Sequence, residues 1–275
     1  MRIDAHQHFW KYNPIKHSWI SDEMSAIRKD FGPVELYQVL QETQLDGSIA
    51  VQVDETTDET SYLFDLAAEN KFIKAVVGWV DLRSEGIEER LQVFQNQSKL
   101  AGFRAIMQGQ EDDAYLSNPV FLKNIKLLAK YDYTYDLLIF HNQLPSLIRF
   151  TDKLPDNKLI LDHIAKPDIK NRNIKAWKEN IKILAAHPNI YCKLSGIITE
   201  ADIKRWTYDD IIPYIETVAE YFGVDRICFG SDWPVCIVAG TYHQVYDTID
   251  KFSAQLNKQD REKLFGDNTA KFYNL

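Results

Sequence analysis

The chain has only three cysteines, and no two of them are spaced as Cys-X-X-Cys. An odd and sparse set argues against a disulfide framework and favours a reducing compartment. The N-terminus carries no apolar stretch of signal-peptide length. Nowhere do about 18 apolar residues follow one another, as a membrane-spanning helix requires. We therefore expect a cytoplasmic protein that has no membrane partner.

Positive charge is also in deficit, because 32 Lys and Arg stand against 40 Asp and Glu, a net charge of −8. That balance favours solubility and disfavours nucleic acid as a partner. A hydrophobic share of 45% is ordinary for a globular protein, and 275 residues can bury a sizeable core. Linkers, low-complexity tracts and blocks of charge are missing. We expect residues 1–275 to form a single domain.

Eight short runs rich in Val, Ile, Phe and Tyr recur along the chain. Several are apolar almost without interruption, which is typical of strands covered on both faces. The predicted strands are 2–6, 47–53, 74–80, 102–107, 134–140, 158–164, 189–194 and 226–231. From the second to the eighth they begin at intervals of about 30 residues, the size of a βαβ unit.

Segments with helical periodicity lie between these strands. They are 59–70, 87–97, 120–131, 143–153, 174–186, 209–222 and 242–255. Eight βα units without a break in composition predict an α/β protein built as one (β/α)8 TIM barrel. A doubly wound open sheet is the alternative, but no glycine-rich fingerprint follows the first strand.

A long aromatic excursion, residues 9–33, separates the first strand from its helix. Its aromatic residues are Phe9, Trp10, Tyr12, Trp19 and Phe31. An excursion over the mouth of a barrel can line a pocket. The alternative is a surface flap packed on its own aromatic side chains.

His6 and His8 end the first strand. Residues i and i+2 of a strand point to the same side, so both imidazoles project together. Two nitrogen ligands on one rigid edge suit a divalent transition metal such as zinc. Barrel active sites lie at this C-terminal end of the strands. A surface pair without a function is the alternative.

Three other strand ends carry groups that can act beside a metal. His163 interrupts the apolar end of the sixth strand, and Asp232 ends the eighth. His141 ends the fifth strand or opens the loop after it. In a barrel all three lie at one mouth with the first-strand histidines, where a carboxylate can hold a metal and accept a proton from water. The alternatives are a buried structural His163 and an Asp232 that caps the next helix.

The chain resembles the amidohydrolase superfamily in an ordered set of motifs: DAHQHFW, GFRAIMQ, LDHIAKPDI, CKLSG, FGSDWPVC and the closing FGDNTAKFYNL. Within it, the chain is most similar to the amidohydrolase 2 group of TIM-barrel hydrolases, which includes L-fuconolactone and L-rhamnonolactone hydrolases. The resemblance implies a hydrolase that opens a sugar-acid lactone by attack of water on the ring carbonyl. The alternatives are a 2-pyrone-4,6-dicarboxylate lactonase, a metal-dependent decarboxylase of the same superfamily, or a barrel that only binds sugar acids.

The resemblance also implies the functions of single residues. His6 and His8 match the first-strand ligands of a metal or of the substrate, and His163 matches the sixth-strand histidine. Asp232 matches the eighth-strand aspartate, which accepts the proton of the attacking water. His141 falls where the wider superfamily has a fifth-strand histidine, and we expect it to bind substrate.

One divalent ion at most is expected. Superfamily members with two metals have a bridging Lys or Glu on the fourth strand, where this chain offers Arg104 and Gln108. Zinc held by His6, His8 and Asp232 is the first choice, although some lactonases of the group are thought to work without a metal. A small lactone is the expected partner, and a homo-oligomer is compatible with the sequence.

Arg104 lies inside an apolar strand, where an unpaired charge is costly. It either pairs with a carboxylate such as Asp81 or Asp54, or acts in catalysis by donating to the lactone carbonyl or to a substrate carboxylate.

Four further residues are interpreted from their positions near strand ends. Gln52 lies at the end of the second strand and is expected to bind substrate. Trp79 and Trp233 are expected to stack on a sugar-like ring, with a place in the core as the alternative for either. Cys236 has no evident base partner, so we interpret it as a packing residue.

Overall fold

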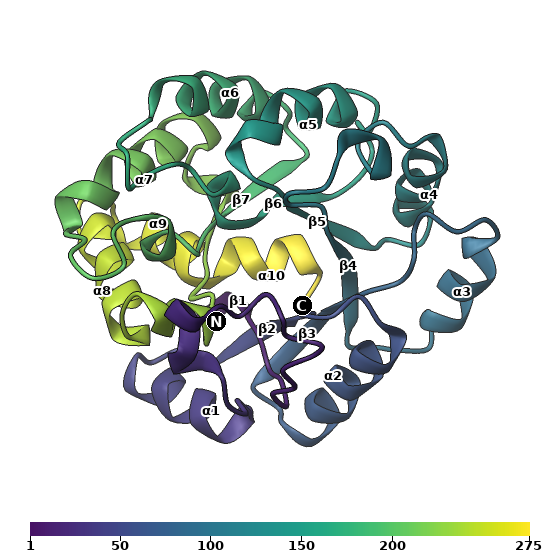
Figure 1. Cartoon of the computed structure of the whole chain (residues 1–275), viewed down its shortest axis with the longest axis horizontal. Helices are drawn as coiled ribbons and strands as arrows, with labels where there is room; N and C mark the ends of the chain where they lie inside the picture. Colours follow the sequence, from purple (N-terminus) through teal and green to yellow (C-terminus); the bar gives the residue numbers. More distant parts are fainter.

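The computed structural model describes residues 1–275, except for the side chain of Asp113. Eight parallel strands lie in chain order in one sheet that curls into a barrel (Figure 1). The strands are β1 (Ile3–Gln7), β2 (Gly47–Val51), β3 (Ile73–Gly78), β4 (Leu100–Ile106), β5 (Thr134–Leu138), β6 (Leu159–Leu161), β7 (Ile190–Leu194) and β8 (Ile227–Phe229). Backbone hydrogen bonds from His8 to Trp233 (2.7 Å) and from Asp232 to His6 (2.8 Å) join the two edges of the sheet. The predicted TIM barrel is confirmed.

The helices form a ring around this sheet (Figure 1). They are α1 (Pro33–Glu42), α2 (Thr57–Glu69), α3 (Ile87–Phe94), α4 (Pro119–Lys130), α5 (Leu144–Thr151), α6 (Lys175–Ala185), α7 (Tyr208–Phe222) and α8 (Tyr242–Ser253). All seven predicted helices form, with ends that differ by a few residues. Two short helices at the C-terminus, α9 (Lys258–Glu262) and α10 (Asn268–Tyr273), were not predicted, because five or six residues are too few to show a helical period.

Helix α4 shows how the sequence builds one of these units. The Asn118 side chain accepts a hydrogen bond from the backbone N–H of Phe121 (3.1 Å), and Pro119 follows it in the first turn, where no N–H is needed. Phe121, Ile125 and Leu128 form the buried stripe of the helix. Each such side chain contributes roughly 1.5–3 kcal/mol when it is removed from water.

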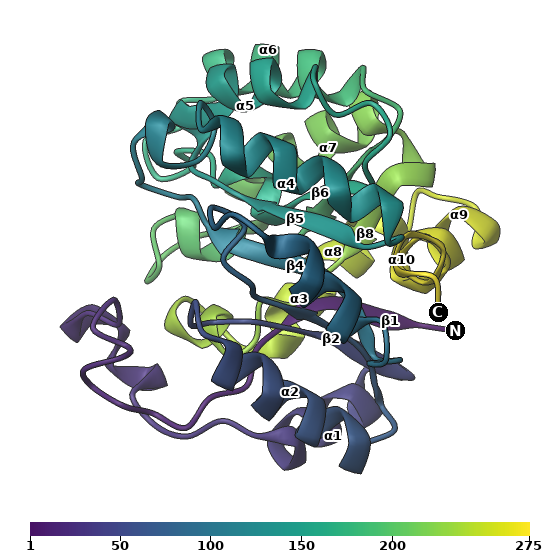
Figure 2. The same cartoon turned by 90° about the vertical axis from the view of Figure 1, so that its right-hand side faces the viewer.

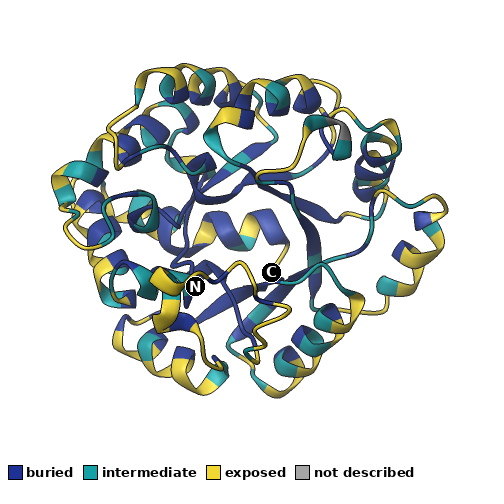
Figure 3. Cartoon of the chain, in the orientation of Figure 1, coloured by how far each residue is buried: buried dark blue, intermediate teal, exposed yellow. Residues whose placement is uncertain are grey.

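The two ends of the barrel differ. Figure 2 shows both termini and α10 at the end where the strands begin, and the long excursion after β1 at the opposite side. Phe272 and Tyr273 of α10 pack against a buried layer that includes Ile3, Ile49 and Ile160, and Figure 3 shows that most of the strand residues are buried. The floor is therefore closed, and the mouth lies at the C-terminal ends of the strands. Within the described part of the chain, no helix is long and apolar enough to span a membrane.

The excursion after β1 packs on its own aromatic side chains. Trp10 pairs with Phe31 through backbone hydrogen bonds, with ring centroids 5.4 Å apart. Phe31 in turn contacts Trp233, at 5.3 Å between centroids. A hollow of about 180 Å³ opens between this flap and α2, lined by residues that include Trp10 and Glu59. The flap therefore packs on its own aromatic side chains and also lines a pocket, which are the two arrangements that the sequence predicted as alternatives.

Candidate active site

The end of β1 places two imidazoles inside the barrel mouth. His6 and His8 are buried, with their Nε2 atoms 3.1 Å apart. His8 Nδ1 lies 2.8 Å from Val51 O, and since a carbonyl only accepts, Nδ1 must carry the proton. A neutral ring then has its lone pair on Nε2, the form that binds a metal. Burial lowers the pKa of both histidines and so favours that neutral form.

A left-handed turn after β6 carries His163. The four residues 163–166 all have a positive φ, between 46° and 61°. For any residue other than glycine this conformation raises the free energy by about 1–3 kcal/mol. The prediction that the strand continues to residue 164 was wrong, because β6 ends at Leu161. The turn brings the His163 ring to 4.4 Å from the His6 ring, between centroids, and Nδ1 to 2.9 Å from Ser195 Oγ.

Asp232 completes this cluster from the segment after β8. Its Oδ1 lies 3.3 Å from His8 Nε2 and 3.8 Å from the Nε2 atoms of His6 and His163. Burial favours the neutral acid, but the three histidines outweigh burial and hold the pKa of Asp232 well below its usual range. Helix α8 begins ten residues later, at Tyr242, so Asp232 does not cap it. One carboxylate oxygen thus faces three imidazole nitrogens.

This donor set fits a single divalent ion. His6, His8 and Asp232 offer ligand atoms that all lie within 4.8 Å of one another. Neutral imidazoles with a carboxylate are ligands that borderline divalent ions prefer. A backbone carbonyl and a serine hydroxyl hold the opposite nitrogens of His8 and His163, as outer groups do around bound metals.

Arg104 on β4 is buried among partners other than the expected ones. Its Nη1 donates to Asp162 Oδ2 at 3.1 Å, and its Nη2 donates to the backbone and side-chain oxygens of Gln52. The expected structural partners, Asp81 and Asp54, were therefore wrong. Both lie partly exposed beyond the ends of β3 and β2, whereas Asp162 follows β6 inside the mouth.

A buried ion network beneath the site was missed. Lys193 Nζ on β7 lies 2.5 Å from Asp136 Oδ2, 3.0 Å from Asp162 Oδ1 and 3.1 Å from His6 Nδ1. Tyr273 of α10 donates to Asp136 at 2.9 Å. Burial raises the pKa of Asp136 to about 6; for Asp162, Lys193 and His6 outweigh burial and hold the pKa well below its usual range. Charged residues inside the apolar runs TYDLLIF and NIYCKL were the available signal.

The four residues expected to bind substrate occupy different surroundings. Gln52 is buried against Arg104, and Trp233 is buried among the aromatic side chains of the flap, the core alternative. Trp79 is half-buried and packs against the hydrophobic core. His141 lines a large hollow at the mouth.

Cys236 is fully buried, in agreement with its interpretation as a packing residue.

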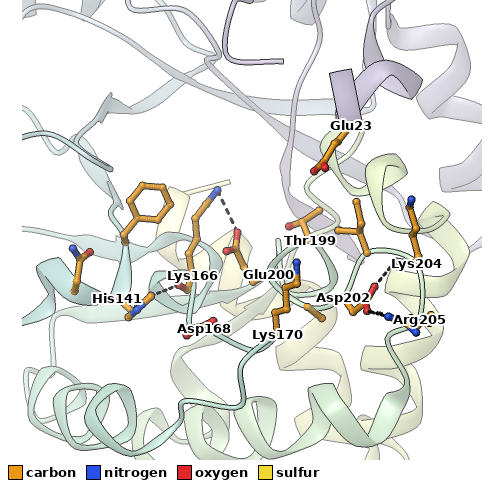
Figure 4. Close-up of a pocket in the computed structure, with 14 residues that line it drawn as sticks. Glu23, His141, Lys166, Asp168, Lys170, Thr199, Glu200, Asp202, Lys204 and Arg205 are labelled. Atoms are coloured by element: carbon orange, nitrogen blue, oxygen red, sulfur yellow. Dashed lines mark hydrogen bonds and ion pairs between the residues drawn. The ribbon is translucent and has the colours of Figure 1, made fainter. Parts of the chain in front are cut away.

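That hollow has a volume of about 960 Å³ and lies beyond the C-terminal ends of β5, β6 and β7 (Figure 4). His141, Lys166 and Glu200 line it together with Glu23 of the flap. Lys166 belongs to the same left-handed turn as His163, although the residues of the buried histidine cluster do not themselves line the hollow. Its volume suits a small-molecule ligand.

Comparison with known proteins places this site in a family. Residues 3–275 match the amidohydrolase family. The chain belongs to that family. An L-fucono-1,5-lactonase of Burkholderia multivorans is 36% identical to this amidohydrolase over 286 residues, covering 100% of this chain and 96% of the relative. An L-rhamnono-gamma-lactonase of Scheffersomyces stipitis is 27% identical and covers 74% of this chain and 70% of that protein.

Solved structures show the same architecture around this amidohydrolase site. An amidohydrolase from Burkholderia multivorans with bound zinc is 35% identical, with a TM-score of 0.97 over 100% of this chain and 99% of that one. A 2,6-dihydroxybenzoate decarboxylase from Rhizobium is 15% identical, with a TM-score of 0.70 over 99% and 98% of the two chains, and shares the fold alone. The family, the zinc-bound relative and the His6, His8 and Asp232 donors together support a divalent metal at this site.

Proposed function

We propose that this amidohydrolase opens L-fucono-1,5-lactone to the free acid and accepts other sugar-acid lactones of similar shape. The predicted reaction class, hydrolysis of a sugar-acid lactone, is confirmed by two full-length relatives named L-fucono-1,5-lactonase. Their identity to this chain, 36% and 35%, supports the same first substrate. Three buried free cysteines agree with the reducing cytoplasm in which we propose that it works.

The observation that carries the proposal is the single Asp232 oxygen facing three imidazole Nε2 atoms. An ionised carboxylate in this position can accept a proton from water while the water oxygen bonds to the ring carbonyl carbon. The bond from that carbon to the ring oxygen then breaks, and the proton reaches the ring oxygen, which becomes a hydroxyl of the product acid. Burial lowers the pKa of His163 to about 4, so its neutral ring can orient the water.

Arg104 has a supporting position in this arrangement. Both of its terminal nitrogens already have acceptors on Asp162 and Gln52, and Nη1 lies 3.3 Å from His6 Nε2. We propose that Arg104 orients Asp162, whose Oδ1 lies 3.3 Å from His6 Nδ1, in place of the predicted direct contact with the substrate carbonyl.

Zinc is the metal that we propose for the site, held by His6, His8 and Asp232. A bound divalent ion would lower the pKa of water and polarise the lactone carbonyl. A second group of potential ligands, His6, Asp162 and His163, shares His6 with the first. Lys193 Nζ faces His6 Nδ1 and Asp162 on that side, and this cation disfavours a second metal ion.

Metal removal should therefore abolish most of the activity. We expect about one equivalent of zinc per chain, loss of more than nine-tenths of lactone hydrolysis after chelation, and recovery when zinc is returned. Elemental analysis and acid-release rates measured on the same samples check this expectation. Two equivalents of metal, or full activity in stripped protein, would refute it.

Gly196 should control the position of His163. Its φ is 58°, and an added Cβ would lie 2.5 Å from His163 Nδ1. We expect Gly196→Ala to displace that ring and slow hydrolysis on the order of 10²-fold. Gly223→Ala is the matched control, since Gly223 also has a positive φ of 71° but nothing lies within 4 Å of the added Cβ. Steady-state kinetics measure both variants. An equal loss of the hydrolysis rate in Gly196→Ala and Gly223→Ala would show that the position of His163 does not control the rate.

A screen of sugar-acid lactones tests the proposed function. Acid release is followed with a pH indicator, with and without chelator, and CO₂ is measured in parallel. We expect the fastest release from L-fucono-1,5-lactone and none of the CO₂ that a decarboxylase produces. Rates equal to spontaneous hydrolysis for every sugar lactone would show that the proposed substrate class is wrong.

A further inference from the structure

Lys166 and Glu200 form an ion pair inside the large hollow that hydrolysis as described does not use. Lys166 Nζ lies 3.6 Å from Glu200 Oε1, and the two side chains are 17% and 22% exposed. Figure 4 shows them reaching toward one another within the hollow. At 3.6 Å the pair is too long for a good hydrogen bond, so both groups retain hydrogen-bonding capacity for a third group.

Two side chains from outside the turn hold the backbone around Lys166. His141 Nδ1 donates to the Lys166 carbonyl at 2.8 Å, and Trp177 Nε1 donates to the carbonyl of Ile164 at the same distance. A strained left-handed turn persists only where its surroundings fix it, and such turns concentrate at functional sites. This turn carries His163 into the buried cluster and Lys166 into the hollow. One short turn therefore positions a side chain of the cluster and a side chain of the hollow.

The hollow contains both donors and acceptors of hydrogen bonds. Lys166 is a donor and Glu200 an acceptor. His141 Nδ1 donates to a carbonyl, so Nε2 of the neutral ring is a second acceptor. Burial raises the pKa of Glu200, the charge of Lys166 opposes that rise, and the charge of Asp232 adds to it.

The charge of the hollow indicates the kind of ligand. Its wall carries four Lys or Arg and four Asp or Glu side chains. A dicarboxylate substrate would call for an excess of positive charge. A balanced wall with paired donors and acceptors instead suits a neutral ring that carries several hydroxyl groups.

We propose that Lys166 and Glu200 are specificity-determining residues that bind neighbouring hydroxyl groups of the sugar lactone, with His141 Nε2 accepting from a third hydroxyl. This inference rests on the lactonase function proposed above. It assigns the hydroxyl-bearing side of the ring to the hollow and the carbonyl to the Asp232 cluster.

The test compares Lys166→Met and Glu200→Gln with the wild type. For L-fucono-1,5-lactone we expect KM to rise about tenfold or more in each variant, with kcat within about threefold, because a charged hydrogen bond to substrate is lost. δ-Valerolactone has the same ring without hydroxyl groups. Used as a competitor, it should keep its inhibition constant within about twofold.

Lys178→Met and Glu220→Gln are matched controls. That pair has the same 3.6 Å separation but lies on the outer helices α6 and α7, and we expect wild-type KM in both. The inference is overturned if the Lys166 and Glu200 variants keep wild-type KM, or if they weaken the competitor as much as the sugar lactone. A wild type that opens no sugar lactone would instead refute the proposed function.

Discussion

Replacing Asp232 with Asn is expected to lower kcat for lactone hydrolysis by a factor on the order of 10²–10⁴, the range typical of losing a general base. The substitution keeps the size of the side chain and removes the group that accepts the water proton. Asp232 lies at a strand end facing three histidines, outside the hydrophobic core. We therefore expect KM to change little and the midpoint of thermal unfolding to stay close to that of wild type.

Bound metal must be measured in the same Asp232→Asn sample, because Asp232 is also a proposed ligand. Activity that stays low after the metal content has been restored to the wild-type level identifies the lost base. Most of the wild-type turnover remaining would assign the base to another group, such as His163 or His141. Unfolding of the variant would show that Asp232 is structural.

Lys193→Met is expected to lower the free energy of unfolding by about 3–5 kcal/mol, the largest stability effect that we expect from a single substitution. Met is similar in length to Lys but leaves Asp136 and Asp162 without their shared cation. All three residues are fully buried, so water cannot replace the lost partner. Urea unfolding followed by circular dichroism measures the loss.

Two further variants test whether the loss of stability in Lys193→Met comes from the buried charges. Lys130→Met breaks a solvent-exposed pair with Glu88 and should leave the free energy of unfolding close to that of wild type. Adding Asp136→Asn to Lys193→Met removes one of the unpaired charges and should recover part of the loss. If Lys193→Met costs no more than Lys130→Met, the buried network does not stabilise the barrel as argued.

The order of elements could be predicted from the sequence because apolar runs repeat with the spacing of a βαβ unit. The same reasoning placed His6, His8 and Asp232 at strand ends, and the parallel topology brought those ends together. The end of β6 could not be predicted. Leu161 is followed by five non-glycine residues, and no pattern in them signals four successive left-handed conformations.

The pairing of buried charges was beyond prediction for a different reason. Arg104 could be identified as a buried cation, but its partner depends on which side chains meet across the barrel interior, and that side chain proved to be Asp162. Lys193 was overlooked because a single lysine in an apolar strand resembles an exposed edge residue. Trp233 followed the core alternative since the flap after β1 folds over it.

The central claim is that this protein directs water onto the carbonyl carbon of a sugar lactone. Hydrolysis of L-fucono-1,5-lactone in ¹⁸O-labelled water, followed by mass spectrometry of the product, tests it most directly. We expect one ¹⁸O atom in the carboxylate of the acid, formed much faster than in a sample without protein. Label in the hydroxyl that was the ring oxygen, or no acceleration over the protein-free sample, would contradict the claim.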